Sequence, residues 1–227
     1  MITGVLVPAA VLGVLILVAV LFFQRGREGV DLSPRALLRL YLYIASLAGI
    51  VLLVIGLASV TNFALASALG DEFVYGGSVG PVPVRPCPPG AIDCPDISEE
   101  EQARIVEQQR LEQERRRSED LIRGLTFSVF GAVFWGAHWM ARRGLVGPEE
   151  RGSVLWRGYL MLGTVVFGLA TVVLLPTGLY QALANVLLSS PDPYYYRPGA
   201  DALGGGLVSL PVWLVYLRLA VGEFRGA

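Results

Sequence analysis

Long apolar segments alternate with short charged segments along this chain. Five apolar stretches stand out: Val5–Phe23, Leu40–Phe63, Leu125–Ala141, Gly158–Leu175 and Leu203–Leu217. The first, second and fourth meet or approach the ~20 residues that a helix needs to cross a bilayer, while the third and fifth are shorter and have aromatic residues at their ends. We expect the second and fourth helices to continue to about Leu69 and Leu188, and Pro176 to kink or interrupt the fourth.

This pattern predicts an all-α integral membrane protein with five transmembrane helices. The composition agrees, because 54% of the 227 residues are hydrophobic and only 16% are charged, whereas soluble domains carry about a quarter charged residues. The net charge of −1 gives no electrostatic reason to expect nucleic acid as a partner. The expected partners are the lipid bilayer and other membrane-protein subunits.

The arginines predict the topology. The first apolar stretch has arginines after it and none before it, unlike a signal peptide, so it is expected to be a retained helix. Five crossings place three groups of arginines on one side: Arg25, Arg27, Arg35 and Arg39; Arg142, Arg143, Arg151 and Arg157; Arg218 and Arg225. The positive-inside rule makes that side cytoplasmic and puts the N-terminus outside. Further arginines lie on the other face, in a long loop that is also rich in acids, where the rule is weaker.

That long loop, about residues 64–123, is expected to be extracytoplasmic. Its first part is rich in Gly and Pro and contains Cys87 and Cys94. Two cysteines do not supply the four ligands of a structural metal site, and the C-x-x-C-H pattern of haem attachment is absent. A disulfide between them is the favoured interpretation if the loop lies outside the cytoplasm.

The second part of the loop has a charged, helix-favouring pattern. Ser98 and Glu101 match a capping box, and three same-face ion pairs are expected: Glu100–Arg104, Glu112–Arg116 and Arg115–Glu119. No proline occurs between Asp96 and Pro148. The charged helix and the third apolar stretch are therefore expected to form one rod of about 45 residues, roughly 65–70 Å long. The alternative is a polar helix that folds back onto the membrane surface.

The second and third helices share a pattern with the fourth and fifth. At the helix starts, Leu37, Arg39, Tyr41 and Leu42 recur as Leu155, Arg157, Tyr159 and Leu160; at their outer ends, Ala64-Leu65-Ala66 recurs as Ala182-Leu183-Ala184; and Trp135-x-x-His138-Trp139 has a weaker counterpart in Trp213-x-x-Tyr216-Leu217. The pattern indicates two hairpins of the same orientation, a parallel repeat. The alternative is a chance match between Leu-rich helices. The expected divisions are 1–36, with the N-terminal helix; 37–144, the first hairpin with its insertion; and 145–227, the second hairpin.

The R-x-Y-L-Y opening and the W-x-x-H-W closing resemble a bacterial family of uncharacterised transmembrane proteins, a domain of unknown function built from tandem two-helix units. The resemblance covers the second to fifth helices. It departs in the second copy, where Met161 replaces the second tyrosine of the opening and Tyr216-Leu217 replaces His-Trp. It implies a multi-helix membrane fold and no activity. Together with the topology predicted from the arginines, it leads us to expect a multi-pass protein of the bacterial inner membrane, with the N-terminus outside and the C-terminus cytoplasmic.

The predicted helices carry little catalytic or transport chemistry. Asp, Glu, Lys and Arg are absent from the middle of all five, although ionisable groups usually mark ion paths inside membranes. His138 is the only histidine. It is a haem ligand, a proton-handling group or, as we favour, part of an interfacial aromatic belt beside Trp135 and Trp139. We therefore expect no enzyme activity, no cofactor and no metal.

Three further patterns concern contacts. Gly124, Ser128, Ala132 and Gly136 recur every four residues and predict a helix-packing stripe, against either a neighbour in the chain or a partner subunit. Tyr194, Tyr195 and Tyr196, in the second outer loop, fit a membrane-interface belt and, alternatively, a partner contact. Gly204-Gly205-Gly206 is not a phosphate loop, because no Lys-Ser/Thr follows it.

These patterns favour a non-catalytic membrane scaffold or accessory subunit of a membrane complex. The alternative is a carrier or sensor of an uncharged or lipidic small molecule, which would need an apolar cavity between the hairpins. A redox subunit that binds haem through His138 is a third hypothesis.

Overall fold

A computed structural model describes residues 34–76, 98–145, 153–187 and 199–225. The described residues form five helices: α2 (Pro34–Leu69), α3 (Asp71–Tyr75), α4 (Glu99–Leu145), α5 (Val154–Leu187) and α6 (Asp201–Arg225). The described part of the chain is therefore all-α, as predicted. Three predictions lie outside it: the first apolar stretch, the disulfide between Cys87 and Cys94, and the contact role of Tyr194, Tyr195 and Tyr196.

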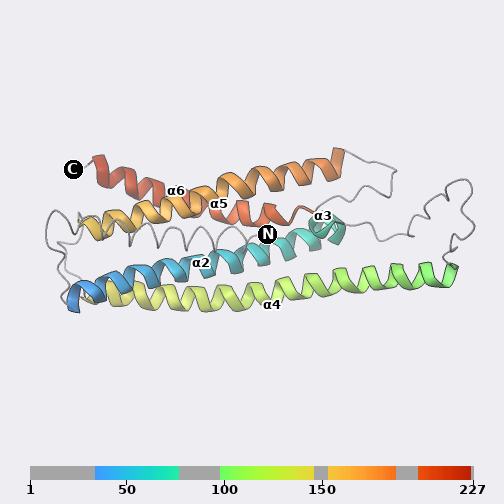
Figure 1. Cartoon of the computed structure of the whole chain (residues 1–227), viewed down its shortest axis with the longest axis horizontal. Coiled ribbons are helices and arrows are strands. Elements are labelled where there is room, and N and C mark those ends of the chain that lie inside the picture. Colours follow the sequence, from blue (N-terminus) through green and yellow to red (C-terminus); the bar gives the residue numbers. More distant parts are fainter. Residues whose placement is uncertain (1–33, 77–97, 146–152, 188–198, 226–227) are drawn as a thin grey trace, which may run out of the picture.

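The four long helices form two antiparallel pairs (Figure 1). We call α2 with α4 the first hairpin and α5 with α6 the second hairpin. Both hairpins begin at the same end of the molecule, which is also where α4 and α6 end. α2 lies in the middle, because its other side contacts α6 and, over a shorter length, α5.

α4 is a single helix of 47 residues, about 70 Å long at 1.5 Å per residue. The predicted rod is therefore confirmed, and the folded-back helix is wrong. Ser98 caps its start, since the Ser98 hydroxyl accepts a hydrogen bond from the Glu101 amide at 3.2 Å. Acidic residues fill the first turn and arginines the last, which complements the helix dipole at both ends.

Exposed ion pairs follow the charged half of α4. The predicted pairs Glu112–Arg116 (2.7 Å) and Arg115–Glu119 (3.0 Å) form, together with Arg110–Glu114 (3.2 Å). Glu100–Arg104 is not among the ion pairs of the described residues. Each exposed pair contributes only about 0.3–0.5 kcal/mol, so the pairs support the helix without fixing its position.

α5 continues through Pro176 without interruption, and α6 continues through Pro211. Proline leaves the carbonyl four residues earlier without its usual donor. At this turn of α5 the Thr177 hydroxyl donates to the neighbouring carbonyl of Val173 at 2.6 Å. Packing against α6 and such side-chain donors keep a helix continuous through proline.

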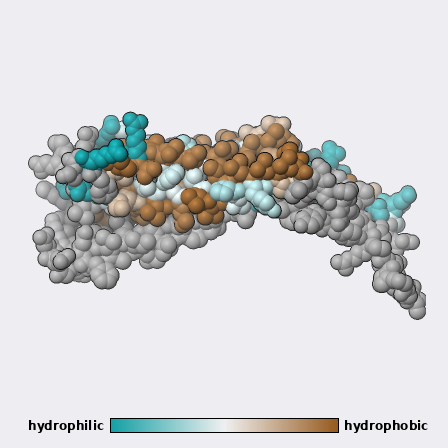
Figure 2. Space-filling view, turned by 90° about the horizontal axis from the view of Figure 1, so that it is seen from above, coloured by the Kyte–Doolittle hydropathy of each residue, from teal (hydrophilic) through white to brown (hydrophobic). Residues whose placement is uncertain are grey.

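Three of the described helices are long and apolar enough to cross a membrane, over Leu37–Leu69, Leu155–Leu187 and Asp201–Glu223. Figure 2, which views the molecule from the side of α5 and α6, shows the apolar band, with hydrophilic residues at its left end and further, fainter ones toward the right. The third predicted stretch, in α4, is not among the three. It is interrupted by His138 and its neighbouring tryptophans, and arginines bound it on both sides.

The core lies where α2, α5 and α6 meet. Its buried members come from all three helices: Tyr43, Leu47, Ile50, Val51, Val54, Ile55, Tyr159, Leu160, Leu162, Val166, Phe167, Ala170, Leu174, Ala202, Tyr216 and Ala220. α4 adds only partly buried rings, such as Phe127 and Trp135. α4 is therefore an edge helix attached to the bundle through α2.

Glycines bring α2 and α4 unusually close together. A Cβ on Gly56 would collide with the backbone of Ser128, and one on Gly131 would collide with the backbone of Leu53. A Cβ on Gly124 would lie 2.8 Å from the amide nitrogen of Val60. Backbones that approach this closely are typical of glycine-mediated helix pairs in membranes.

The predicted i+4 stripe on α4 follows this contact only in part. Gly124 and Ser128 lie in it, but Ala132 is exposed and Gly136 has no neighbour within 4 Å of a Cβ. A step of four residues advances about 40° around a helix, so the stripe rotates out of the contact. The contact instead continues at Gly131, because alternating steps of four and three stay on one face.

We predict opposite effects for alanine at two glycines of α4. Gly131→Ala should lower the melting temperature in mild detergent, since overpacking at a fixed backbone costs about 1–3 kcal/mol. Gly136→Ala, the matched control, should leave it unchanged or raise it slightly, because alanine favours the helix. Equal melting temperatures for the two variants would contradict the close contact.

Candidate functional site

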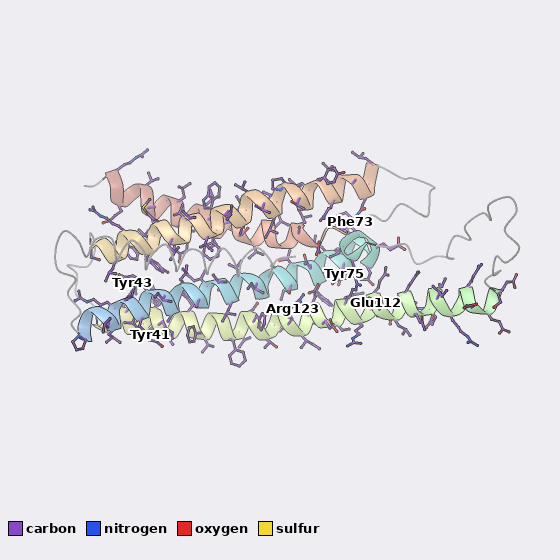
Figure 3. All side chains as sticks on the ribbon, viewed as in Figure 1. Tyr41, Tyr43, Phe73, Tyr75, Glu112 and Arg123 are labelled. Carbon is purple, nitrogen blue, oxygen red and sulfur yellow. The ribbon has the colours of Figure 1, made fainter. Side chains whose placement is uncertain are left out.

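Each hairpin contains one tyrosine-centred hydrogen bond near the end where it begins. In the first hairpin, the Tyr41 hydroxyl lies 3.2 Å from Nε2 of His138. In the second hairpin, the hydroxyls of Tyr159 and Tyr216 lie 2.6 Å apart. The two pairs occupy matching positions of the helices, and Figure 3 marks Tyr41 on α2.

Other contacts of the two hairpins also lie at equivalent positions when the residues of each helix are counted from these two pairs. Gly131 lies against Leu53 in the first hairpin, and at the matching positions the Thr171 hydroxyl donates to the Ser209 hydroxyl at 3.1 Å. Further out, Gly124 lies against Val60, and the matching pair places Gly178 against Ala202. The helices of both hairpins therefore pair in the same register.

Arg142 joins the two hairpins at the end where they begin. Its guanidinium carbon lies 5.3 Å from the ring centre of Tyr43, 5.1 Å from that of Trp156 and 5.6 Å from that of Tyr159. The rings come from α2 and α5, and Arg142 comes from α4. A guanidinium at these distances is attracted by the ring faces. Nη1 of Arg142 is buried and has no hydrogen-bond partner among the described residues, so the rings are its main stabilising contacts.

α3 joins the hairpins at the opposite end. The carbonyl of Phe73 accepts a hydrogen bond from the Ala200 amide at 2.8 Å and from Nδ2 of Asn185 at 3.3 Å. Val74 is fully buried, and a Cβ on Gly199 would collide with its carbonyl. α3, which follows directly after α2, thus docks onto α5 and onto the residues just before α6.

A buried carboxylate links α3 to the first hairpin. Asp120 of α4 accepts a hydrogen bond from the Tyr75 hydroxyl at 2.9 Å and is paired with Arg123, whose Nε donates to the Ser59 hydroxyl at 3.2 Å. Figure 3 marks Tyr75 and Arg123 at this end. Burial, and then the charge of Asp120, raise the pKa of Tyr75 above its usual value. A neutral Tyr75 that donates to an ionised Asp120 satisfies both groups.

Both ring nitrogens of His138 are engaged within the first hairpin. Nδ1 lies 2.7 Å from the carbonyl of Phe134 and must donate to it, which leaves Nε2 as the acceptor for the Tyr41 hydroxyl. A haem would have to displace Tyr41 to reach Nε2. This geometry fits the interfacial aromatic interpretation of His138, whose ring also lies 4.2 Å from that of Phe134.

Several of these residues were not singled out in the sequence. The sequence gives Arg142 a role only in topology and no role to Asp120, and it offers Gly204 only as part of a glycine triplet that is not a phosphate loop. Gly204 in fact lets α6 approach α2, since its Cβ would lie 2.9 Å from the carbonyl of Ala58. Among the described residues, no group of three or more His, Cys, Asp and Glu side chains could hold a metal ion.

These observations suggest a helical membrane protein: three helices are long and apolar enough to span a bilayer, and the polar contacts concentrate near the two ends of the bundle. The family described as "Domain of unknown function (DUF5671)" matches residues 102–215. The chain belongs to this family. The matched half of the chain begins inside α4 and leaves out α2, where the resemblance in the sequence began. No curated protein and no solved structure matches the chain.

We predict that Arg142→Gln lowers the melting temperature in mild detergent, because it removes a guanidinium from three rings at about 1–2 kcal/mol in total. Arg143→Gln is the matched control, since among the described residues Arg143 stacks on Trp139 of its own helix, with its guanidinium carbon 3.6 Å from the ring centre, and on no ring of the second hairpin. A change at Arg143 as large as that at Arg142 would contradict a joint between the hairpins.

We predict that Tyr75→Phe also lowers the melting temperature at neutral pH, because Asp120 loses a donor. In the unfolded chain tyrosine ionises near its usual pKa of 10.0, whereas the pKa of folded Tyr75 is higher. The stabilisation is therefore fully present below pH 10.0 and is lost as the pH rises above it. The difference in melting temperature between the two proteins should shrink above that pH. A difference independent of pH would contradict the contact.

Proposed function

We propose that this protein is a non-catalytic, multi-pass protein of the bacterial inner membrane, which serves as a scaffold or accessory subunit of a membrane complex. The charged residues of α4 and α6 bound an apolar segment whose length suits the thickness of a bilayer. Arg123 and Arg142 of α4 are separated by about 28 Å, and Asp201 and Arg218 of α6 by about 26 Å, at 1.5 Å per residue. The hydrocarbon core of a bilayer is ~30 Å thick.

In this proposal α4 is a fourth crossing, although its composition alone is less apolar than that of the other three helices. Its second half runs beside α2 from Gly124 to His138. Two helices in backbone contact share the same depth, so α4 enters the membrane with α2. Its exposed side chains in this half are largely apolar: Ile122, Leu125, Val129, Phe130, Val133, Phe134 and Met140.

The orientation is proposed from the arginines. One end of the described bundle carries Arg39, Arg142, Arg143, Arg157 and Arg218. The positive-inside rule favours this end as the cytoplasmic one, with the C-terminus inside. The first apolar stretch would be the fifth crossing and would place the N-terminus outside.

The matched registers of the two hairpins support the proposal that they are copies of one two-helix unit. The tyrosine pairs Tyr41–His138 and Tyr159–Tyr216 are the contacts that most directly support it. Residues 37–144 and 145–227 would then be the two units, and the segment at about 64–123 an insertion into the first.

The observation that carries the scaffold proposal is the continuous α4. Its second half packs on α2, while its first half extends outward past α3, where Gln113 contacts the carbonyl of Gly76 at 3.5 Å. From Glu99 to Gln113 the rod extends about 21 Å further. A rigid, charged arm fixed to a membrane anchor is suited to contacting another subunit outside the membrane.

The filled core favours this scaffold over a carrier or sensor. A carrier of an uncharged or lipidic molecule needs an apolar cavity between the hairpins. Where α2, α5 and α6 meet, buried side chains such as Phe167, Leu160 and Val54 fill the space between them.

The proposal predicts that the tagged protein, extracted from its native membrane in mild detergent, retains a membrane-protein partner. Reversing the charges of two ion pairs, Arg110→Glu with Glu114→Arg and Arg115→Glu with Glu119→Arg, should release that partner. The reversal preserves the i,i+4 pairing, so the helix should persist. The matched control, Arg225→Glu, alters a charge at the opposite end and should retain the partner.

Recovery of the native protein with no partner would contradict the scaffold role. Retention of a partner by the charge-reversed variant would show that the partner does not bind through the charged half of α4. Helicity measured by circular dichroism should be the same for both variants.

A further inference from the structure

One face of α2 holds the second hairpin. The Ser46 hydroxyl lies 3.5 Å from that of Tyr159, and Nδ2 of Asn62 donates to the carbonyl of Asp201 at 3.0 Å. The ring centre of Tyr43 lies 5.1 Å from that of Tyr159. Between these polar contacts the face is apolar and buried: Leu47, Val51, Val54 and Ile55 belong to the core.

The matching positions of α5 form an exposed face on the other side of the molecule. We call it the α5 face. The α5 face consists of Met161, Val165, Leu169, Val172, Val173 and Tyr180. In this order, these residues match Tyr43, Leu47, Val51, Val54, Ile55 and Asn62 of α2. Val54 is 1% exposed and its counterpart Val172 is 65% exposed. The second hairpin therefore presents outward the surface with which the first hairpin binds a neighbour.

The converse holds for the first hairpin. The second hairpin meets α2 through Trp156, Tyr159 and Gly204. Tyr216 belongs to the core that the second hairpin shares with α2, and Val208 and Val212 pack against that core. The counterparts on the first hairpin are Leu38, Tyr41, Thr126, Phe130, Phe134 and His138, which we call the α4 face. Phe130 is 68% exposed and Tyr41 is 55% exposed. Each of the two surfaces that meet between the hairpins therefore has a counterpart elsewhere on the molecule. These counterparts, the α5 face and the α4 face, lie on opposite sides of the described bundle, and no described helix covers them.

We propose that the α4 face of one copy of this chain docks on the α5 face of a second copy, repeating the contact that joins the two hairpins within the chain. Both hairpins begin at the same end of the molecule (Figure 1), so repeating their relation keeps the second copy upright in the same bilayer. The contact joins two different surfaces, and such contacts generate closed rings or open chains of subunits.

The repeated contact would differ from the internal one in its spacing. Within the chain, Gly204 allows α6 to approach Asn62 and Ala58 of α2 closely. Between copies, Thr126 would face Tyr180, and both are larger than their counterparts. The helices would therefore lie further apart at the outer end. Nearer the cytoplasmic end, Tyr41 of one copy would face Thr164 of the other, as Tyr159 faces Ser46 within the chain. This pair of hydroxyls would help to set the register between the two copies.

Cross-linking between two tagged copies tests the contact. In a full chain with Cys87→Ser and Cys94→Ser, one copy carries Thr126→Cys and the other carries Tyr180→Cys. Both are expressed together in native membranes and treated with a short bis-maleimide. The expected result is a covalent dimer that carries both tags, and little dimer when either variant is expressed alone.

The matched control replaces Tyr180→Cys with Leu179→Cys, which is also exposed but lies about 100° away around α5. The mixed dimer should then fall at least severalfold. Equal yields at the two positions, or a monomer in which both cysteines react without linking because lipid covers the faces, would overturn the proposal. Strong linking of Thr126→Cys to itself would instead indicate a symmetric dimer and would overturn it as well.

Discussion

The backbone contact between α2 and α4 determines how the rest of the molecule is arranged. Gly56 and Gly131 allow the two helices to approach until backbone meets backbone, and such a contact leaves little freedom to slide. α2 is long and apolar, so whatever depth α2 takes, the adjoining half of α4 shares. Because α4 is one continuous helix, the same contact also fixes how far its charged half extends beyond the bundle.

Polar groups sit mainly at the two ends of the bundle, and apolar packing fills the middle. Arg142 is held by rings at one end, and Asp120, Arg123 and Tyr75 form a linked set at the other. Between these ends the hairpins are joined by buried apolar side chains, and a hydroxyl contact, Thr171–Ser209, lies between α5 and α6 of the second hairpin. A bundle of this kind suits a stable anchor, because Arg142 is stabilised by aromatic rings at one end and the buried Asp120 is paired with Arg123 at the other.

The sequence predicted the features that depend on residues close together along the chain. The Ser98 cap, the absence of proline and the i,i+4 charges were sufficient for the rod of α4, and the end of α2 at Leu69 was predicted as well. Features that depend on which helices meet were not predictable in the same way. The ring contacts of Arg142 need α2 and α5 beside α4, and Gly131 entered the contact because a packed pair follows steps of four and three. In the proposed topology, the membrane depth of α4 likewise follows from its neighbour and not from its own composition.

The depth of α4 in the bilayer is the measurement that tests this account most directly. Nitroxide labels at Gln108, Val129 and Val133, one per protein in reconstituted vesicles, report their access to oxygen, which concentrates in lipid, and to a water-soluble nickel complex. The account predicts that oxygen access dominates at Val129 and Val133 and that nickel access dominates at Gln108. Nickel access dominating at all three positions would contradict it, since the second half of α4 would then lie in water.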